Sequence, residues 1–184
     1  MPLTSYEKGM SERMIFKKHT ILVSSAFVLI ICAAAPIIAQ LVPLNGALRG
    51  SYTITQIRAS PPLYSGHSEA VGNVLHMGKT TLIVDGQSSI DSAGNIVPVP
   101  DTWNASLTAA NGDKVFLVYF FPSNDNASGK YALSGKYTIT GGTGRFAGAS
   151  GEGSYTAEGT YLVFPGAVSG QYAGSLSGDI STKN

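Results

Sequence analysis

Residues of the types that do acid–base chemistry are few in this sequence of 184 residues. The candidate catalytic residues are Glu69, His76 and Arg58, accompanied by His67 and Asp85, all on or beside the first three predicted strands of the domain. If one of these side chains points into an apolar cavity, desolvation would shift its pKa and suit it to proton transfer. The alternative is that they all face solvent, at the rim or on the outer wall of the domain.

Metal and cofactor chemistry is not expected from this sequence. Cys32 lies in an apolar segment near the N-terminus, and the two histidines that follow it are too few for a recognisable zinc site. The run from Gly142 to Ala147 fits the loose dinucleotide fingerprint, but no helical pattern follows that could bind a phosphate at its N-terminus. Acidic and basic residues nearly balance after residue 39, so no nucleic-acid partner is implied.

Residues 1–39 have the anatomy of a signal peptide. Lys17 and Lys18 precede an uncharged stretch from residue 20 to residue 42, and small residues near its end suit cleavage after Ala39. We therefore expect a signal helix, a mature chain from Gln40, and a secreted or periplasmic protein whose only membrane contact is this segment. The alternative is an uncleaved membrane anchor, because about 20 apolar residues can span a bilayer. The segment has normal signal-peptide proportions when read from Met14, which could be the true start.

Residues 45–184 are predicted to form one all-β domain. Helical periodicity is absent, and short alternating segments are separated by turn residues. About eight strands are expected, near residues 51–58, 69–76, 79–85, 103–109, 114–121, 131–139, 153–163 and 171–180. Asn111 and Gly112 suit a tight type I′ hairpin, and similar breaks are expected at residues 85–86 and 124–126. The interpretation is an eight-stranded antiparallel barrel built as a meander of hairpins.

The predicted interior of this barrel is either packed solid or wide enough for one small ligand. The strand from Val115 to Phe121 is apolar on both faces, so its outer face should be covered by a partner subunit or a terminal segment. The predicted ligand-binding residues are Tyr52, Ile54, Leu117 and Tyr119, which would make an apolar wall.

A glycine-rich turn gives the most specific motif. It contains Gly141, Gly142, Gly144, Phe146 and Gly148, where glycines supply backbone angles that other residues avoid and Phe146 can fold back as an apolar plug. The run resembles the Gly-Gly-Thr/Ser-Gly-x-Phe turn of allene oxide cyclases and dirigent proteins.

The resemblance extends less specifically to Ser51–Pro62, similar to the first cyclase strand, and to His76-Met77-Gly78, similar to bacterial secreted members of the same superfamily. It implies an eight-stranded barrel with an apolar cavity, often a homotrimer. However, Thr53 and Thr55 occupy the positions of the cyclase's carboxylate and amide residues, and the mature domain has no cysteine. Allene oxide cyclase activity is therefore not expected.

Three functions remain open at this point. The first is a cofactor-free exported barrel that binds a small apolar or aromatic molecule. The second is a cyclase or isomerase that folds a hydrophobic substrate in the cavity. The third is a solid-cored structural protein of the envelope or surface. An ionisable side chain inside the barrel would distinguish the second function from the first, and a cavity would distinguish both from the third.

Overall fold

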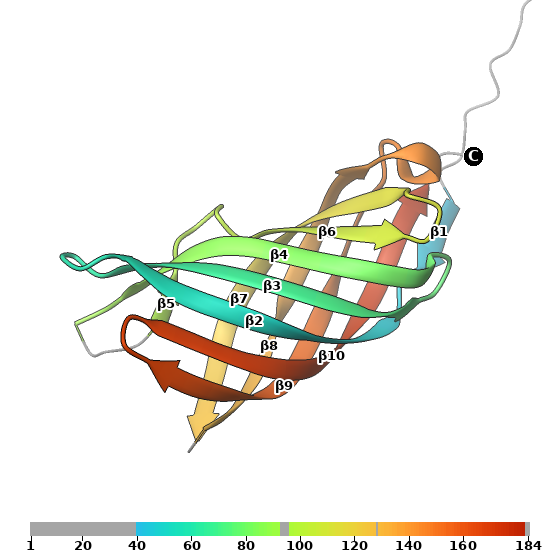
Figure 1. Ribbon diagram of the computed structural model, residues 1–184. Helices are drawn as coiled ribbons and strands as arrows, with labels where there is room; N and C mark the ends of the chain where they lie inside the picture. The colour runs from blue at the N-terminus through green and yellow to red at the C-terminus, as the bar shows by residue number, and fades with distance from the viewer. Residues whose placement is uncertain (1–39, 93–95, 128, 183–184) are drawn as a thin grey trace, which may run out of the picture. The chain divides into compact units, whose positions relative to one another are not determined.

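A computed structural model describes residues 40–92, 96–127 and 129–182 of the chain. Within these residues the structure is antiparallel β-sheet with one turn of 3-10 helix, η1 (Gly144–Phe146), and no helix there is long and apolar enough to cross a membrane (Figure 1). The predicted signal helix in residues 1–39 lies outside the described residues. The strands are β1 (Gln40–Pro43), β2 (Gly46–Arg58), β3 (Leu63–Val74), β4 (Gly78–Ile90), β5 (Ile96–Pro98), β6 (Asn104–Ala109), β7 (Lys114–Ala127), β8 (Lys130–Gly142), β9 (Ser150–Phe164) and β10 (Ala167–Thr182).

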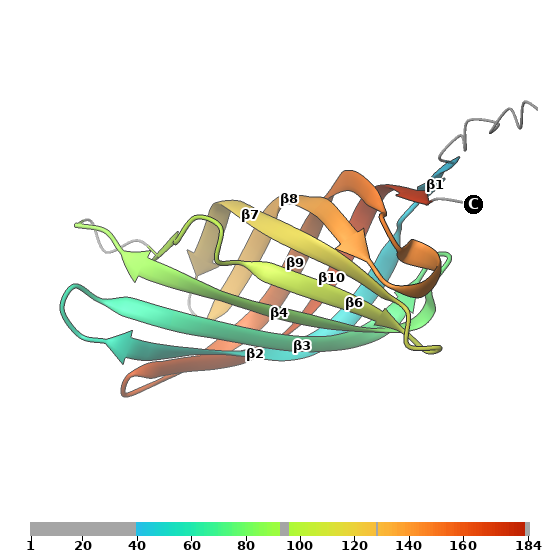
Figure 2. The ribbon, with the colours of Figure 1, turned by 90° about the horizontal axis from the view of Figure 1, so that it is seen from above.

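Eight of these strands close into a barrel, which confirms the predicted fold class. The order β10-β2-β3-β4-β6-β7-β8-β9 is completed because β10 pairs with β9 on one edge and with β2 on the other. Figure 2 shows the strands wrapping around a common interior. The short strands β1 and β5 are additions, paired with β10 and β4. The ring of eight strands is formed by residues from Gly46 to Thr182.

Several strands are longer than predicted, and two of the predicted breaks were wrong. Residues 85–86 lie inside β4, and residues 124–126 lie inside β7, which continues past an irregularity in its pairing with β8 between Phe120 and Ser123. The hairpin between β6 and β7 was also misassigned: only Gly112 has a positive φ, of 89°, whereas a type I′ turn needs two such residues. At residues 85–86 and 124–126, polar and glycine residues therefore did not mark a strand end, because cross-strand pairing outweighed local turn preference.

Side chains along each strand alternate between the interior and the outer wall. In β7, Val115, Leu117 and Tyr119 are buried, whereas Phe116 and Phe120 are exposed. The interior is packed solid at the end of the barrel that carries η1, which we call the closed end. Leu44 and Ile180 are fully buried there with Val115, and Phe146 from η1 covers them from outside the ring. This packing supplies much of the hydrophobic stabilisation of the fold.

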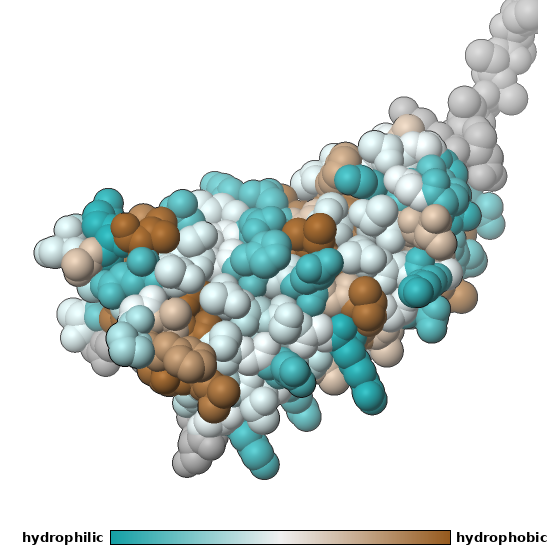
Figure 3. All heavy atoms as spheres, in the orientation of Figure 1, coloured by the Kyte–Doolittle hydropathy of each residue, from teal (hydrophilic) through white to brown (hydrophobic). Residues whose placement is uncertain are grey.

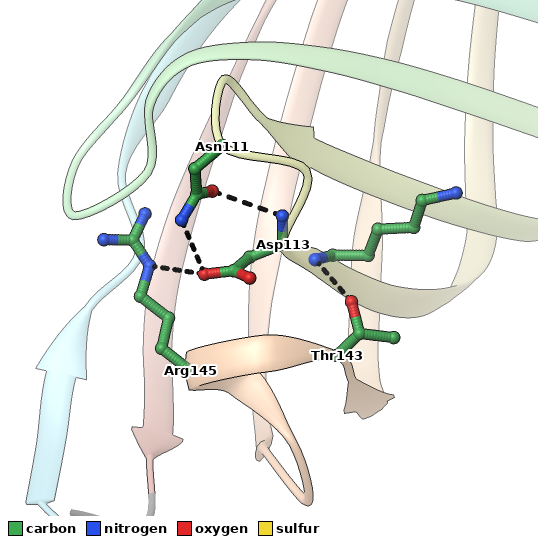
Figure 4. A network of polar contacts seen from close by, with 5 residues as sticks. Asn111, Asp113, Thr143 and Arg145 are labelled. Carbon is green, nitrogen blue, oxygen red and sulfur yellow. Dashed lines mark hydrogen bonds and ion pairs between the residues drawn. The ribbon is translucent and has the colours of Figure 1, made fainter.

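The turn that carries η1 is held against the β6–β7 turn by a small polar network (Figure 4). Asn111 Nδ2 donates to Asp113 Oδ2 at 2.8 Å, and Arg145 Nε lies 3.4 Å from the same oxygen. The backbone N–H of Lys114 donates to Thr143 Oγ1 at 3.0 Å. These contacts join two turns that are far apart in the sequence and so fix the cover over the closed end.

Candidate functional site

The opposite half of the barrel is hollow. A cavity of about 480 Å³ opens at the end formed by the β2–β3 and β9–β10 hairpins, which we call the open end. Its wall combines aromatic rings with aliphatic side chains and a few hydroxyl groups. The principal side chains of the wall are Tyr52, Ile54, Tyr64, Ser68, Leu82, Val84, Ser88, Trp103, Tyr119, Tyr131, Leu133, Tyr155, Tyr161, Val168, Tyr172 and Leu176.

The aromatic rings of the wall lie over glycines of neighbouring strands. Tyr131 faces Gly159 across the β8–β9 ladder, and the ring would collide with any side chain placed on that glycine. Tyr155 lies in the same way over Gly135. A ring of this size fits against the inner wall because the opposite residue has no Cβ. A tyrosine opposite a glycine on β8 and β9 therefore has room to lie against the inner wall.

Trp103, the single tryptophan of the chain, also lies over glycines, on the part of the wall formed by β3 and β4. Its ring lies over Gly66 of β3 and Gly86 of β4, and its indole Nε1 donates to the carbonyl oxygen of Gln87 at 2.7 Å. The polar atom of the indole is thereby satisfied by the backbone, and the ring presents an apolar surface to the cavity.

Ring contacts hold the tyrosines to one another. Tyr52 and Tyr131 meet edge to face with centroids 5.3 Å apart, and Tyr119 and Tyr155 do so at 4.6 Å. Both separations are within the range in which such pairs attract beyond their burial alone. The hydroxyl groups of Tyr172 and Ser68 form a hydrogen bond of 2.8 Å in the same wall. The wall is thus preorganised before any ligand enters.

Burial raises the pKa of these phenols, because the anionic form loses its hydration. The pKa of Tyr52 rises to about 12, with a smaller contribution from Tyr161, and the pKa values of Tyr131 and Tyr155 are raised further. Burial also raises the pKa of Tyr172, although its hydrogen bond with Ser68 opposes the shift. At neutral pH the cavity therefore offers neutral hydroxyl groups on an apolar wall.

Three of the four predicted ligand-binding residues lie in the cavity wall. These are Tyr52, Ile54 and Tyr119, while Leu117 lies deeper, in the solid core at 1% exposure. Their role in binding stays a prediction. Wall residues that were not predicted from the sequence include Trp103, Leu133 and Val168. The inward direction of Leu133 could have been predicted, because it lies two residues after Tyr131 on the same strand and so points to the same face.

The candidate catalytic residues lie outside the cavity. Glu69 is exposed on the outer wall, His76 in the β3–β4 turn and Arg58 at the end of β2. His67 contributes to the rim, but strand alternation turns its ring outward, where Nδ1 lies 2.7 Å from Asp85 Oδ1 with both side chains more than half exposed. The structure thus does not bring these groups together in the interior. Over the described ranges, no three histidine, cysteine or acidic side chains form a group that could hold a metal ion.

The five predicted turn residues all lie at the closed end. Gly144 and Gly148 have φ angles of 58° and 71°, and Gly142 is close enough to Phe146 that a side chain there would overlap the Phe146 Cβ. Phe146 is 2% exposed, with the Arg145 guanidinium 5.0 Å from the centre of its ring. The turn belongs to the cover of the barrel and is remote from the cavity.

The fold and the site together define a class: closed eight-stranded antiparallel barrels with a solid end and a cavity at the other. Among known proteins, no family model matches the sequence and no curated protein does. A solved structure that aligns with this chain is that of the pterocarpan synthase dirigent protein, over 78% of this chain and 94% of that one, with 12% identity and a TM-score of 0.32. At this level of similarity the activity of that protein does not carry over to this chain.

Proposed function

We propose that this chain is an exported, cofactor-free barrel that binds one small apolar or aromatic molecule in the cavity at its open end. The observation that carries the proposal is the cavity itself, about 480 Å³ and walled by tyrosine rings and aliphatic side chains. This volume is within the range of small-molecule sites, and most of such a ligand's surface would be buried in it. Neutral phenols would orient a ligand that carries one or two hydrogen-bond acceptors.

Two features favour binding over the other two functions. No carboxylate, amine or guanidinium side chain belongs to the cavity wall among the described residues, and the His67 imidazole at the rim turns outward to Asp85. Inside the cavity, a cyclase or isomerase would therefore have phenols of raised pKa for proton transfer. A structural protein with a uniformly solid core would have no such cavity. The hollow half of the barrel thus supports a binding protein.

A homotrimer, implied by the resemblance to dirigent proteins, is part of the same proposal. Phe116 and Phe120 point outward from β7 with 38% and 50% of their surface exposed. A neighbouring subunit that packed against β7 would bury both rings, which a monomer leaves in contact with water. Light scattering coupled to gel filtration should give three times the mass of one chain.

Titration with the fluorescent probe 1-anilinonaphthalene-8-sulfonate tests the binding site. We expect one site per chain, and at a hundredfold excess over Kd the stabilisation of about 2.7 kcal/mol should raise Tm by about 5 °C or more. Ala157→Phe should fill the cavity and abolish binding, while the matched control Ala173→Phe points outward on β10 and should not.

A second cavity-filling variant keeps the test decisive if Ala157→Phe fails to fold. Val168 lines the cavity near its mouth and is only partly buried, so Val168→Trp should block entry with little effect on the core. Folding of each variant is checked by circular dichroism. Probe binding that survives both substitutions in folded protein would overturn the proposal.

A further inference from the structure

The tip of the β9–β10 hairpin is the most apolar exposed part of the described surface. Leu162, Val163 and Phe164 are exposed over 66%, 70% and 50% of their surfaces. Successive strand residues point to opposite faces, so exposure of all three shows that the hairpin projects past the barrel wall. The sequence carries no charged residue from Gly159 to Gly178. Figure 3 shows brown apolar surface at the end of the barrel where Figure 1 draws the β9–β10 hairpin.

This hairpin forms one side of the cavity mouth. Tyr161 and Val168, which flank the tip on β9 and β10, belong to the cavity wall. The tip is tied to the end of β2 because the backbone N–H of Gln56 donates to the carbonyl oxygen of Gly166 at 2.8 Å. Ile57, exposed over 51%, extends the apolar surface onto β2. We call Ile57, Leu162, Val163 and Phe164 the apolar lip.

Charged residues are distributed unequally around the mouth. Arg58 follows Ile57 directly, and Lys130 is the register partner of Thr160 on β9, so a cation flanks each side of the apolar lip. Asp91 and Asp101 lie in the segments after β4 and β5, across the barrel from β9 and β10 in the strand order. Closer to β9, Asp125 and Glu158 are both in register with Ala132 of β8, two residues further along β8 than Lys130. The charged residues nearest to the apolar lip are therefore Arg58 and Lys130, and the acidic residues lie further from it.

We infer that the apolar lip docks on the surface of a lipid bilayer that contains anionic lipid. Large apolar side chains with flanking cations are what an interfacial segment presents: the apolar groups enter the headgroup region and the cations stay at its surface. Docking in this way places the cavity mouth against the lipid, so an apolar ligand exchanges with the bilayer without crossing water. A second copy of the chain fits the lip less well, since four side chains are far fewer than the roughly 20 to 30 residues a side of a stable interface.

Co-sedimentation with vesicles tests the inference, using the chain from Gln40 onward, which contains the whole barrel. Vesicles of phosphatidylcholine and of phosphatidylcholine with phosphatidylglycerol are compared. We expect the triple variant Leu162→Thr/Val163→Thr/Phe164→Thr to lose about tenfold or more in partitioning to both, because three apolar side chains no longer enter the lipid. The matched control Leu41→Thr/Val71→Thr/Leu75→Thr removes three apolar side chains elsewhere that are each at least half exposed, and it should partition like the wild type.

The cations are tested separately. Arg58→Gln and Lys130→Gln should each lower partitioning to the anionic vesicles by about fivefold and leave partitioning to phosphatidylcholine unchanged. Probe binding in the cavity should be the same in every variant, which distinguishes this inference from the proposed function. Equal partitioning of the wild type and the lip variant would overturn the inference. So would self-association of the wild type that the lip variant abolishes without any vesicle binding.

Discussion

The two ends of the barrel use the same strands and the same alternation for opposite purposes. At the closed end, aliphatic side chains such as Leu44, Val115 and Ile180 meet in the centre and Phe146 covers them. At the open end, tyrosine rings lie flat over glycines such as Gly159 and leave a cavity of about 480 Å³. One set of strands therefore carries a solid half and a hollow half, and the side chains that point inward in each half make the difference.

The largest expected difference between the two ends is in the free energy of unfolding that is lost when an isoleucine is shortened to alanine. Ile139 is 3% exposed in the solid half, so Ile139→Ala should lower the free energy of unfolding by about 2 to 5 kcal/mol. Ile54 lines the cavity and is only partly buried, so Ile54→Ala should cost about 1 kcal/mol or less. Urea denaturation measures both values. Equal losses would contradict the division into a solid and a hollow half.

The next effect concerns the turn that covers the closed end. Gly144 has a φ of 58°, and a Cβ there would overlap the carboxylate of Asp113. Gly144→Val should therefore cost more than the roughly 1 to 3 kcal/mol of a strained backbone position alone. Gly112→Val is the matched control, because Gly112 also has a positive φ but no atom lies within 4 Å of the place that a Cβ would take. If the two variants melt at the same temperature, the Asp113 contact is unimportant.

Alkaline pH should weaken the fold through its buried phenols. Burial, with a smaller contribution from Asp179, raises the pKa of Tyr137 to about 12, and the pKa of Tyr52 also rises to about 12, from 10.0 for an unperturbed tyrosine. The folded state thus holds these protons more tightly than the unfolded state, so the stabilisation is complete below pH 10 and is lost as the pH rises through 12. Denaturant titrations from pH 8 upward should show a flat region and then a decline. A decline that begins well below pH 10 would assign the effect to other groups.

The smallest expected effect compares single hydroxyl groups in the two halves. Tyr137 Oη is buried in the solid half and has no hydrogen-bond partner among the described residues, so Tyr137→Phe should be neutral or stabilise by up to about 1 kcal/mol. Tyr172 shares a hydrogen bond with Ser68 in the cavity wall, so Tyr172→Phe should cost about 0.5 to 1.5 kcal/mol. Thermal unfolding of both variants gives the comparison, and a clear loss for Tyr137→Phe would mean that its hydroxyl is satisfied.

The sequence was sufficient to predict the eight strands and their antiparallel order, because period-two alternation and hairpin turns are local signals. It did not predict which half is hollow. Gly135 and Gly159 fall inside two of the predicted strands, and only the register of β8 against β9 shows that they lie beneath tyrosine rings. Likewise, the position of Leu117 in the solid core rather than in the cavity wall depends on its depth along the barrel, which alternation does not encode.

The barrel closes where β10, the last strand, pairs with β2, the first strand of the ring. Leu176 of β10 pairs with Gly46 of β2 at this seam, so residues that are neighbours in space are separated in the sequence by nearly the whole domain. A chain that emerges N-terminus first, from a ribosome or a translocation pore, consequently cannot complete the ring until its final segment is free. Until then both β2 and β9 keep an unpaired edge. The seam thus makes closure of the barrel a late step, slowed by its dependence on contacts that are distant in the sequence.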